Sequence, residues 1–235
     1  MANIGKKRSA DLVTLVEDCL RSELKPGASI VVGLSGGIDS VALASILAML
    51  RESVSFSLRA VHINHGLSPN AERWSKFCSV LCDGLDIPLI IEQADLSPWA
   101  SLGIEGAARE ARYKLLGKHR ADALLLAHHL NDQAETILVQ LLRGAGVAGL
   151  AGMPEIAAGP LKIIRPFLRL SRDEIEQFAR AKGLSWIDDE SNSDLSRPRN
   201  FLRKEILPVL DARFPGVARR LARSSSHVAD TLHLL

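Results

Sequence analysis

A hexapeptide of glycine and hydroxyl side chains is the strongest chemical signal in the sequence. Its residues are Ser35, Gly36, Gly37, Ile38, Asp39 and Ser40. Adjacent glycines let the backbone approach an anion closely, and free amides at a helix N-terminus bind phosphate. A carboxylate repels phosphate unless a divalent cation lies between them, so Asp39 predicts a bound Mg²⁺. The hexapeptide therefore predicts a site for the phosphates of ATP, with Asp39 as metal ligand.

The sequence on either side supports this interpretation. Residues 29–34 form a continuous apolar run, which is typical of a strand buried on both faces, and a helix is predicted over 39–51. A loop between such elements lies at the carboxyl end of its strand, where open α/β sheets bind ligands. A Gly-Gly turn without a ligand is the alternative, but the strand–hexapeptide–helix order favours phosphate binding.

Two carboxylates, Asp132 and Glu135, form a second candidate site. They lie three residues apart at the start of a helix predicted over 131–143, so their side chains project together. Acidic residues near a helix N-terminus are favourable for the helix dipole, which is the simpler interpretation. Two carboxylates in one turn can also bind an ammonium group, so the pair predicts a site for a lysine-sized amine.

A third set of polar side chains lies on a helix predicted over 104–119. Glu105, Arg109, Arg112 and Tyr113 are spaced so that they lie close to one helix face. Such a face is usually solvated and stabilised by pairs four residues apart. If the face is turned toward a crevice, its carboxylate and guanidinium groups could instead hold a substrate phosphate or amine.

The segment after the second predicted strand is a candidate for adenine binding. That strand is expected over 58–64, and its carboxyl end faces the same crevice as the hexapeptide. Backbone groups near Ala60 and His62 could hold the adenine edge. As residue types alone, His62 and His65 are equally compatible with core or turn histidines.

Strand and helix signals alternate along the first 170 residues. Strands are predicted over 29–34, 58–64, 87–91, 123–127 and 161–164, and helices over 8–24, 39–51, 69–84, 104–119 and 131–143. This alternation is typical of βαβ units, so the fold class is α/β, with a doubly wound, mostly parallel five-stranded sheet. Helices over 171–182, 200–212 and 215–234 follow. We therefore expect a catalytic domain over 1–170 and a small helical extension over 171–235.

The helical extension is basic. Between Arg197 and Arg223 there are eight basic residues, including Arg199 and Arg203, against two acidic ones. A basic segment on a near-neutral body suggests a polyanionic partner, although a solvated helix face is the alternative.

Composition limits the class of protein. Apolar residues make up 47% and charged residues 24%, as in ordinary globular proteins, and the formal net charge is +2. Three cysteines argue against a disulfide scaffold and fit a reducing compartment. The sequence has no run of about 18 apolar residues and no apolar signal core after its basic start, so we expect a cytoplasmic protein without a membrane span.

Several strings taken together resemble one family. SGGIDS, HINHGL, EGAAREARY, AHHLNDQAET, RGAGVAGLAGM, RPFL, DDESNSD and RNFLRKEILP are similar to those of the tRNA(Ile)-lysidine synthetases, within the PP-loop ATP pyrophosphatases. The resemblance extends over residues 30–210. SGGIDS is shared across the superfamily, whereas the HHxxDQxET and RGxGxxGLxGM patterns are much more specific.

The resemblance implies a ligase that acts on tRNA(Ile) with a CAU anticodon. ATP would adenylate the C2 oxygen of the wobble cytidine and release pyrophosphate. The amine of free L-lysine would then attack C2 and expel AMP. Codon reading would change from AUG to AUA. The family is often dimeric, so a homodimer is a further expectation.

Each candidate residue then has an expected role. Asp39 would hold Mg²⁺, and Arg112 or Arg109 would offset charge as pyrophosphate leaves. Asp132 and Glu135 would hold the lysine ammonium, and one of them would accept its proton. Glu105 would contact substrate beside the crevice, and Arg199 and Arg203 would contact ATP or the anticodon phosphates.

Two departures and two rival functions are open. Pro198 stands where many family members have an aromatic residue before the Arg-Asn motif. The family usually continues into C-terminal domains, so we expect this chain to be a naturally short form or an N-terminal portion. A tRNA 2-thiolation enzyme commonly needs a CxxC pair, whereas Cys78 and Cys82 are four apart on a predicted helix. A non-catalytic nucleotide- or RNA-binding module is disfavoured by the three acidic candidates.

Overall fold

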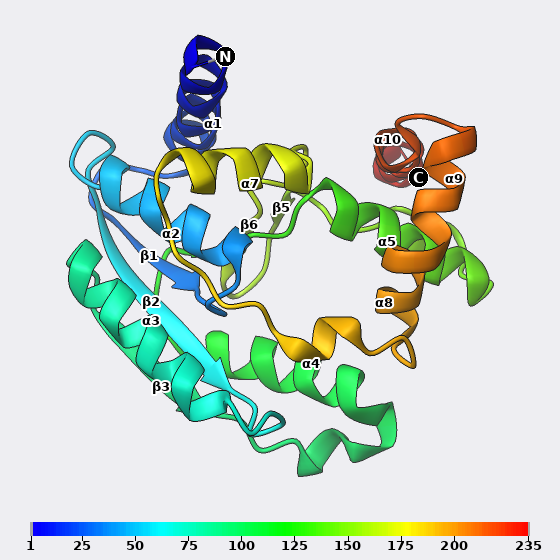
Figure 1. The fold of residues 1–235 in the computed structure, drawn as a ribbon, viewed down its shortest axis with the longest axis horizontal. Helices are drawn as coiled ribbons and strands as arrows, with labels where there is room; N and C mark the ends of the chain where they lie inside the picture. Colours follow the sequence, from blue (N-terminus) through cyan, green and yellow to red (C-terminus); the bar gives the residue numbers. More distant parts are fainter. Residues whose placement is uncertain (1, 235) are drawn as a thin grey trace.

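A six-stranded sheet forms the centre of the molecule (Figure 1). In the computed structural model the described backbone covers residues 2–234, and the described side chains cover 11–232 and 234. The strands are β1 (Ala28–Gly33), β2 (Phe56–Asn64), β3 (Leu89–Gln93), β4 (Ala123–Leu125), β5 (Ile156–Ala157) and β6 (Lys162–Ile164). Their order is β3-β2-β1-β4-β6-β5, and every pairing is parallel except the antiparallel pair of β5 and β6.

The predicted α/β class and the mostly parallel, doubly wound sheet are confirmed. The predicted count of five strands is wrong, because the sheet has six. The additional strand, β5, has two residues and pairs at the edge of the sheet through Ile156 and Ala157. Two residues are too few to establish an alternating pattern, so sequence periodicity could not detect it.

The helices follow the predicted alternation closely. They are α1 (Ala2–Glu23), α2 (Ile38–Leu50), α3 (Ala71–Leu85), α4 (Gly103–Leu116), α5 (Leu130–Leu142), α6 (Val147–Leu150), α7 (Arg172–Ala181), α8 (Pro198–Phe201), α9 (Leu207–Arg213) and α10 (Val217–Leu234). Short 3₁₀ helices cover Ser97–Leu102 and Glu190–Ser193, and a π-helical turn covers Leu202–Ile206.

Alternate residues of the central strands enter two cores. Ile30 and Val32 of β1 face the core made with α1, α2, α3 and α7. Val31, Val61 and Leu124 face the opposite core, which Leu116 of α4 helps to fill. This period of two is what a sheet covered by helices on both faces requires.

The order of connections places the ligand crevice. From β1 the chain moves outward through β2 to β3, then returns across α4 to β4 on the other side of β1. Helices therefore cover opposite faces on the two sides of β1, as in other doubly wound sheets. Ligands in such folds bind beyond the carboxyl ends of the strands at this reversal, here between β1 and β4.

The C-terminal helices lie in two places (Figure 1). Helix α7 packs against α1 and α2, whereas α8 and the π turn pack against α5, and α10 against α5 and α6. The division into domains at residue 170 stays a prediction, but α7 contributes to the core beneath the sheet. Ile175 and Phe178 are its buried contacts there.

One predicted helix is interrupted. The sequence predicts a continuous helix over 200–212, but the structure has α8, the π turn and α9 in succession. Pro208 lies in the first turn of α9 and has no N–H to donate to the carbonyl of Lys204. The wider π turn relieves this interruption, and it carries Arg203.

No helix in the described part of the chain is both long and apolar enough to cross a bilayer. The cytoplasmic location and the homodimer stay predictions.

Candidate active site

The hexapeptide forms a tight loop between β1 and α2. The Ser35 N–H donates to the Oγ of Ser40 at 3.2 Å, and the two hydroxyls lie 3.0 Å apart. The Ser40 hydroxyl also donates to the carbonyl of Gly37 at 2.9 Å. Gly37 is the extended N-cap of α2 and provides no side-chain cap. The amides of the first turn of α2 are therefore not satisfied by a side-chain cap and can receive an anion.

Gly36 is closely covered from outside the loop. Its φ of +87° favours glycine, and a Cβ there would lie 2.7 Å from Cδ1 of Ile187 and 3.3 Å from Sγ of Cys78. The Ile187 N–H donates to the Gly36 carbonyl at 2.9 Å. We call residues 185–197 the strap, because this segment fastens the outer side of the loop.

The strap is also attached beyond β2. The Glu190 carboxylate accepts hydrogen bonds from the Ser68 hydroxyl at 2.6 Å and from the Asn70 amide at 3.1 Å. These bonds lower the pKa of Glu190, the largest contribution being that of Ser68. The strap therefore joins the loop after β1 to the loop after β2.

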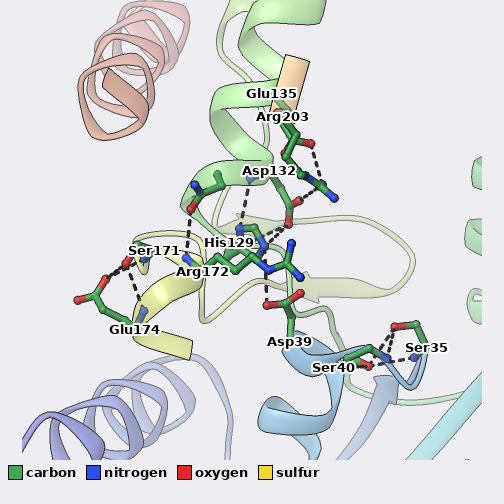
Figure 2. A network of polar contacts seen from close by, with 12 residues as sticks. Ser35, Asp39, Ser40, His129, Asp132, Glu135, Ser171, Arg172, Glu174 and Arg203 are labelled. Carbon is green, nitrogen blue, oxygen red and sulfur yellow. Dashed lines mark hydrogen bonds and ion pairs between the residues drawn. The ribbon is translucent and has the colours of Figure 1, made fainter. Parts of the chain in front are cut away.

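Asp39 lies in the first turn of α2 and points into the crevice (Figure 2). Its Oδ1 is buried and has no hydrogen-bond partner within the described residues. Burial raises the pKa of Asp39, and nearby Asp132 adds to this, whereas His129 and Arg172 oppose it. A carboxylate oxygen in this state fits a divalent cation as its missing partner.

A metal on Asp39 would not be enclosed by protein alone. No group of three or more His, Cys, Asp or Glu side chains in the described chain is arranged to hold a metal ion. Mg²⁺ commonly keeps water and substrate phosphates among its ligands. The residues present therefore fit a Mg²⁺ shared between Asp39 and nucleotide phosphates.

His129 connects the two predicted carboxylate sites, and it was not among the residues predicted from the sequence. It is the N-cap of α5. Its ring Nδ1 accepts a hydrogen bond from the backbone N–H of Asp132 at 3.3 Å, and the backbone N–H of His129 donates to Asp132 Oδ2 at 3.0 Å. Since Nδ1 is an acceptor, the ring proton lies on Nε2. Nε2 is 3.7 Å from Asp39 Oδ1 and 3.6 Å from Asp132 Oδ2. Its proton thus faces both acidic groups.

Asp132 is ionised in this arrangement. Burial opposes its charge, but His129, His128, a backbone N–H and Arg203 together lower the pKa of Asp132 below its ordinary value. Its side chain is 16% exposed, so one side of the carboxylate remains open to the crevice.

Glu135 is paired rather than open. Its side chain is fully buried and accepts two hydrogen bonds from Arg203, Nε to Oε1 at 2.6 Å and Nη2 to Oε2 at 3.0 Å. The same guanidinium lies 3.5 Å from Asp132 Oδ1. Burial opposes the charge on Arg203, but its bonds to Glu135 outweigh this and raise the pKa of Arg203. Burial raises the pKa of Glu135, and the two parallel hydrogen bonds and the charge of Arg203 oppose this by favouring the ionised carboxylate.

Arg199 of α8 contacts both α4 and α5. Its Nε lies 3.2 Å from Glu105 Oε1 of α4, and its Nη2 donates to the Thr136 hydroxyl of α5 at 3.1 Å. The structure therefore brings Glu105 and Arg199 together. This pair connects α4 with α8, which carries Arg199.

Arg112 and Arg109 have different surroundings on α4. The Arg109 guanidinium lies over the Tyr113 ring at 5.1 Å. Arg112 has no ion-pair or hydrogen-bond partner among the described side chains and reaches solvent. The flanking protein nevertheless desolvates it and lowers the pKa of Arg112, and Arg109 and Arg199 add repulsion. This combination is that of a cation in an open crevice.

Two histidines near Arg112 are held uncharged. Burial lowers the pKa of His65 to about 4, with a further contribution from Arg112. Burial likewise lowers the pKa of His128 to about 4, and Asp132 only partly opposes this. The Nδ1 atoms of both rings are buried without a hydrogen-bond partner within the described chain.

The adenine candidates lie deeper than expected. Ala60 is fully buried in β2, and its N–H donates to the Pro88 carbonyl at 2.9 Å. His62 is buried, with its Nδ1 2.9 Å from the Leu34 carbonyl and 3.5 Å from Cys78 Sγ. The adenine role of this segment stays a prediction, and the Ala60 N–H is already committed to the sheet.

Arg172 is a second site residue that sequence reasoning missed. It is the first residue of α7, and Figure 2 shows its guanidinium reaching toward Asp39 and Asp132. Its backbone N–H donates to Asn131 Oδ1 at 3.1 Å. The serine N-cap and the acidic residue three positions later predict the start of α7, but only the fold shows where this side chain points.

Two curated proteins are similar in sequence to this chain over most of its length. The tRNA(Ile)-lysidine synthase of Nitrosomonas europaea is 44% identical over 230 residues, covering 94% of this chain and 50% of that protein. The tRNA(Ile)-lysidine synthase of Chromobacterium violaceum is 46% identical over 208 residues, covering 87% of this chain and 48% of that protein. The chain thus spans about half the length of these relatives.

Solved structures confirm the fold. The U34-tRNA thiolase NcsA from Methanococcus maripaludis, which has a [4Fe-4S] cluster, superposes with a TM-score of 0.77 at 20% identity, covering 96% of this chain and 80% of that one. The NAD⁺ synthetase from Burkholderia pseudomallei gives a TM-score of 0.53 at 16% identity, with 98% and 91% covered. Residues 7–210 match the family described as PP-loop domain. This match includes the hexapeptide, both carboxylates and the strap, and the chain belongs to the PP-loop domain family.

Proposed function

We propose that this chain carries the catalytic part of a tRNA(Ile)-lysidine synthase, which joins L-lysine to C2 of the wobble cytidine in CAU-anticodon tRNA(Ile). The observation that carries the proposal is the position of His129, whose Nε2 lies within 3.7 Å of both Asp39 and Asp132. A phosphate site and an amine site therefore adjoin in one crevice. The names of the relatives support the same reaction.

In the activation step, the C2 oxygen of cytosine attacks the α-phosphorus of ATP. The bond from that oxygen to phosphorus forms, and the bond to the bridging oxygen breaks, so pyrophosphate leaves with the electron pair. Ser35, Ser40 and the α2 amides hold the phosphates. When bound at Asp39, Mg²⁺ supplies positive charge to the phosphates. Arg112, which is unpaired, offsets the negative charge that develops.

In the ligation step, the amine of lysine attacks C2 and AMP leaves. Asp132 is the carboxylate that meets the amine, because it is ionised and partly open to the crevice. It also accepts the proton that the amine loses. Glu135 supports the site by holding Arg203, and it can bind the ammonium itself only if this ion pair opens.

Arginines around the crevice provide contacts for RNA. Arg109 and Arg112 lie on α4, and Arg199 faces them from α8. Phosphate contacts of this kind give an affinity that decreases with salt concentration. An anticodon loop would add contacts to unstacked bases.

Sulfur transfer, the rival activity, finds less support. Cys78 and Cys82 are buried, and burial raises their pKa values to about 12 and about 11. A thiolate is the reactive form of cysteine, so neither side chain is suited to carry sulfur at neutral pH.

Mass spectrometry of the anticodon fragment after incubation with ATP, Mg²⁺ and lysine tests the proposal directly. We expect a lysine-sized mass gain on the wobble cytidine that requires all three. Asp132→Asn should abolish this gain while pyrophosphate release with tRNA persists. A sulfur-sized gain, or no gain with an intact tRNA, would contradict the proposal. Lysidine formation by Asp132→Asn at the wild-type rate and with the wild-type KM for lysine would contradict the assignment of the amine site.

A further inference from the structure

We propose that Arg172 binds the pyrophosphate group of ATP and stabilises it as it leaves. This inference rests on the proposed function and assigns a residue of the activation step. Arg172 begins α7, and its side chain extends toward Asp39 of the predicted phosphate loop, Ser35–Ser40 (Figure 2).

The backbone of Arg172 is held in a fixed position. Its N–H donates to Asn131 Oδ1 at 3.1 Å, and the Leu130 N–H donates to the Leu170 carbonyl at 2.8 Å. Ser171 caps α7, and its Oγ donates to the Glu174 carboxylate at 2.6 Å. The start of α7 is therefore joined to the start of α5, which also carries Asp132. The backbone from which the Arg172 side chain extends is therefore fixed beside the crevice.

The guanidinium of Arg172 differs from those of Arg199 and Arg203 by having no ion-pair or hydrogen-bond partner within the described chain. Arg203 is held by Glu135, and Arg199 by Glu105 and Thr136. Within the described chain, Arg172 forms neither an ion pair nor a side-chain hydrogen bond, although its charge lowers the pKa of Asp39. The Arg172 side chain is partly exposed, so its guanidinium, which has no hydrogen-bond partner in the described chain, can receive an anionic ligand.

Position separates Arg172 from Arg112, which is also unpaired. Arg112 lies on α4 and acts on the rings of His65 and His128. Arg172 lies on α7 and acts on Asp39, the carboxylate next to the phosphate loop. The two cations therefore approach the nucleotide from different sides. Arg172 is the one placed for the phosphates that the loop holds.

The chemistry of the leaving group fits a guanidinium. As the bond between the α-phosphorus and its bridging oxygen breaks, the electron pair passes to pyrophosphate and raises its negative charge. A guanidinium can donate two parallel hydrogen bonds to phosphate oxygens, which a lysine ammonium cannot reproduce. Arg172 thus binds pyrophosphate more strongly than it binds the unbroken triphosphate.

Two measurements test Arg172. Calorimetric titration of magnesium pyrophosphate into the protein reports binding without tRNA or lysine. Exchange of labelled pyrophosphate into ATP, with CAU tRNA(Ile) present, reports the reverse of activation. For Arg172→Ala we expect the pyrophosphate dissociation constant and its exchange KM to rise by roughly 10–100-fold, the range for a lost charge-assisted hydrogen bond. The KM for lysine should stay unchanged.

Variants and rescue separate binding from structure. Arg172→Lys should recover only part of the pyrophosphate affinity. Added guanidinium ion should increase the rate of pyrophosphate exchange in Arg172→Ala but leave the rate of the wild-type protein unchanged. Arg169→Ala is the matched control, because Arg169 is exposed and pairs with Glu155 at 2.8 Å. Its pyrophosphate affinity should equal that of the wild-type protein.

The outcomes for Arg172 and for the proposed function can be distinguished. Equal pyrophosphate affinity in the wild-type protein and in Arg172→Ala overturns the inference, whatever the protein does to tRNA. A clear loss of affinity, together with no lysidine formed by the wild-type protein, supports a pyrophosphate contact and instead contradicts the lysidine reaction.

Discussion

Charged side chains are paired on one wall of the crevice and unpaired on the other. On the wall of α5, α8 and the π turn, acidic and basic groups neutralise one another, through Glu135 with Arg203 and Arg199 with Glu105 across to α4. On the facing parts of α4 and α7, the guanidinium groups of Arg112 and Arg172 have no ion-pair or hydrogen-bond partner among the residues that the structure describes. Paired charges form a preorganised part of the fold, whereas unpaired ones remain available to a ligand. The difference predicts which substitutions affect stability and which affect only the reaction.

The largest effect is expected on the unpaired wall. Arg112→Ala should lower kcat/KM for tRNA adenylation by about 10²–10³-fold, the range for removing one preorganised charge-stabilising group. Its free energy of unfolding should change by less than about 0.5 kcal/mol, because the guanidinium has no partner in the described chain.

Steady-state kinetics and urea unfolding of one preparation of Arg112→Ala measure its kcat/KM and its free energy of unfolding. A loss of activity that parallels a loss of stability would show that Arg112 belongs to the structural network. That result would remove the distinction between the walls.

The paired wall should respond in the opposite way. Glu135→Gln or Arg203→Gln breaks a buried ion pair and should cost about 3 kcal/mol of unfolding free energy. The cost comes mainly from the charge left without its partner. The double substitution should therefore cost less than the sum of the two single ones, as a double-mutant cycle in urea measures.

A surface pair provides the control for this cycle. Glu176 and Arg180 lie four residues apart on α7, with their side chains 37% and 66% exposed. Their coupling should be below about 0.5 kcal/mol. A coupling between Glu135 and Arg203 as small as this would mean that the buried pair is not preorganised.

The smallest effect concerns the two histidines near Arg112. His65 and His128 have pKa values of about 4 in the folded protein against an ordinary value of 6.5. The unfolded chain therefore binds more protons between these values, so this contribution to stability is complete above pH 6.5 and is lost as pH falls toward 4. Each ring should contribute about 1–2 kcal/mol of loss at pH 5, since both retain some solvent contact.

Urea unfolding between pH 7.5 and 4.5 measures this loss. His65→Asn with His128→Asn should flatten the pH dependence. An unchanged slope would show that these rings do not titrate as described, and that the wall near Arg112 is not desolvated.

Local sequence was enough to predict the tight turn of Ser35 to Ser40 between a strand and a helix, and five of the six strands. Ser35 to Ser40 form one turn, and their roles depend on neighbours within five positions. The strands β1 and β4 are short apolar runs, and the glycine-rich loop and His128 follow them within three residues, so their place at the carboxyl edge of the sheet follows from topology. Asp132 and Glu135 were likewise found from their spacing within one helical turn.

Long-range pairing was not accessible to the same reasoning. Glu135 and Arg203 are 68 positions apart, so neither their spacing nor their residue types indicated that they neutralise one another. The position of Arg172 depends on how α7 meets α5, which is a property of the packed fold. His129 has an ordinary sequence position before a helix, and only the capping geometry shows that Nε2 carries the ring proton.

The hydrogen bond from Ile187 to Gly36 has a consequence for the synthesis of the protein. The phosphate loop leaves the ribosome early, but its fastening segment follows about 150 residues later. At about 5–20 residues per second, the nascent chain waits for several seconds or longer with a loop that lacks this contact. If the loop binds nucleotide as proposed, we expect this binding to be weak until the strap has emerged, and ATP to stabilise the domain only after that point.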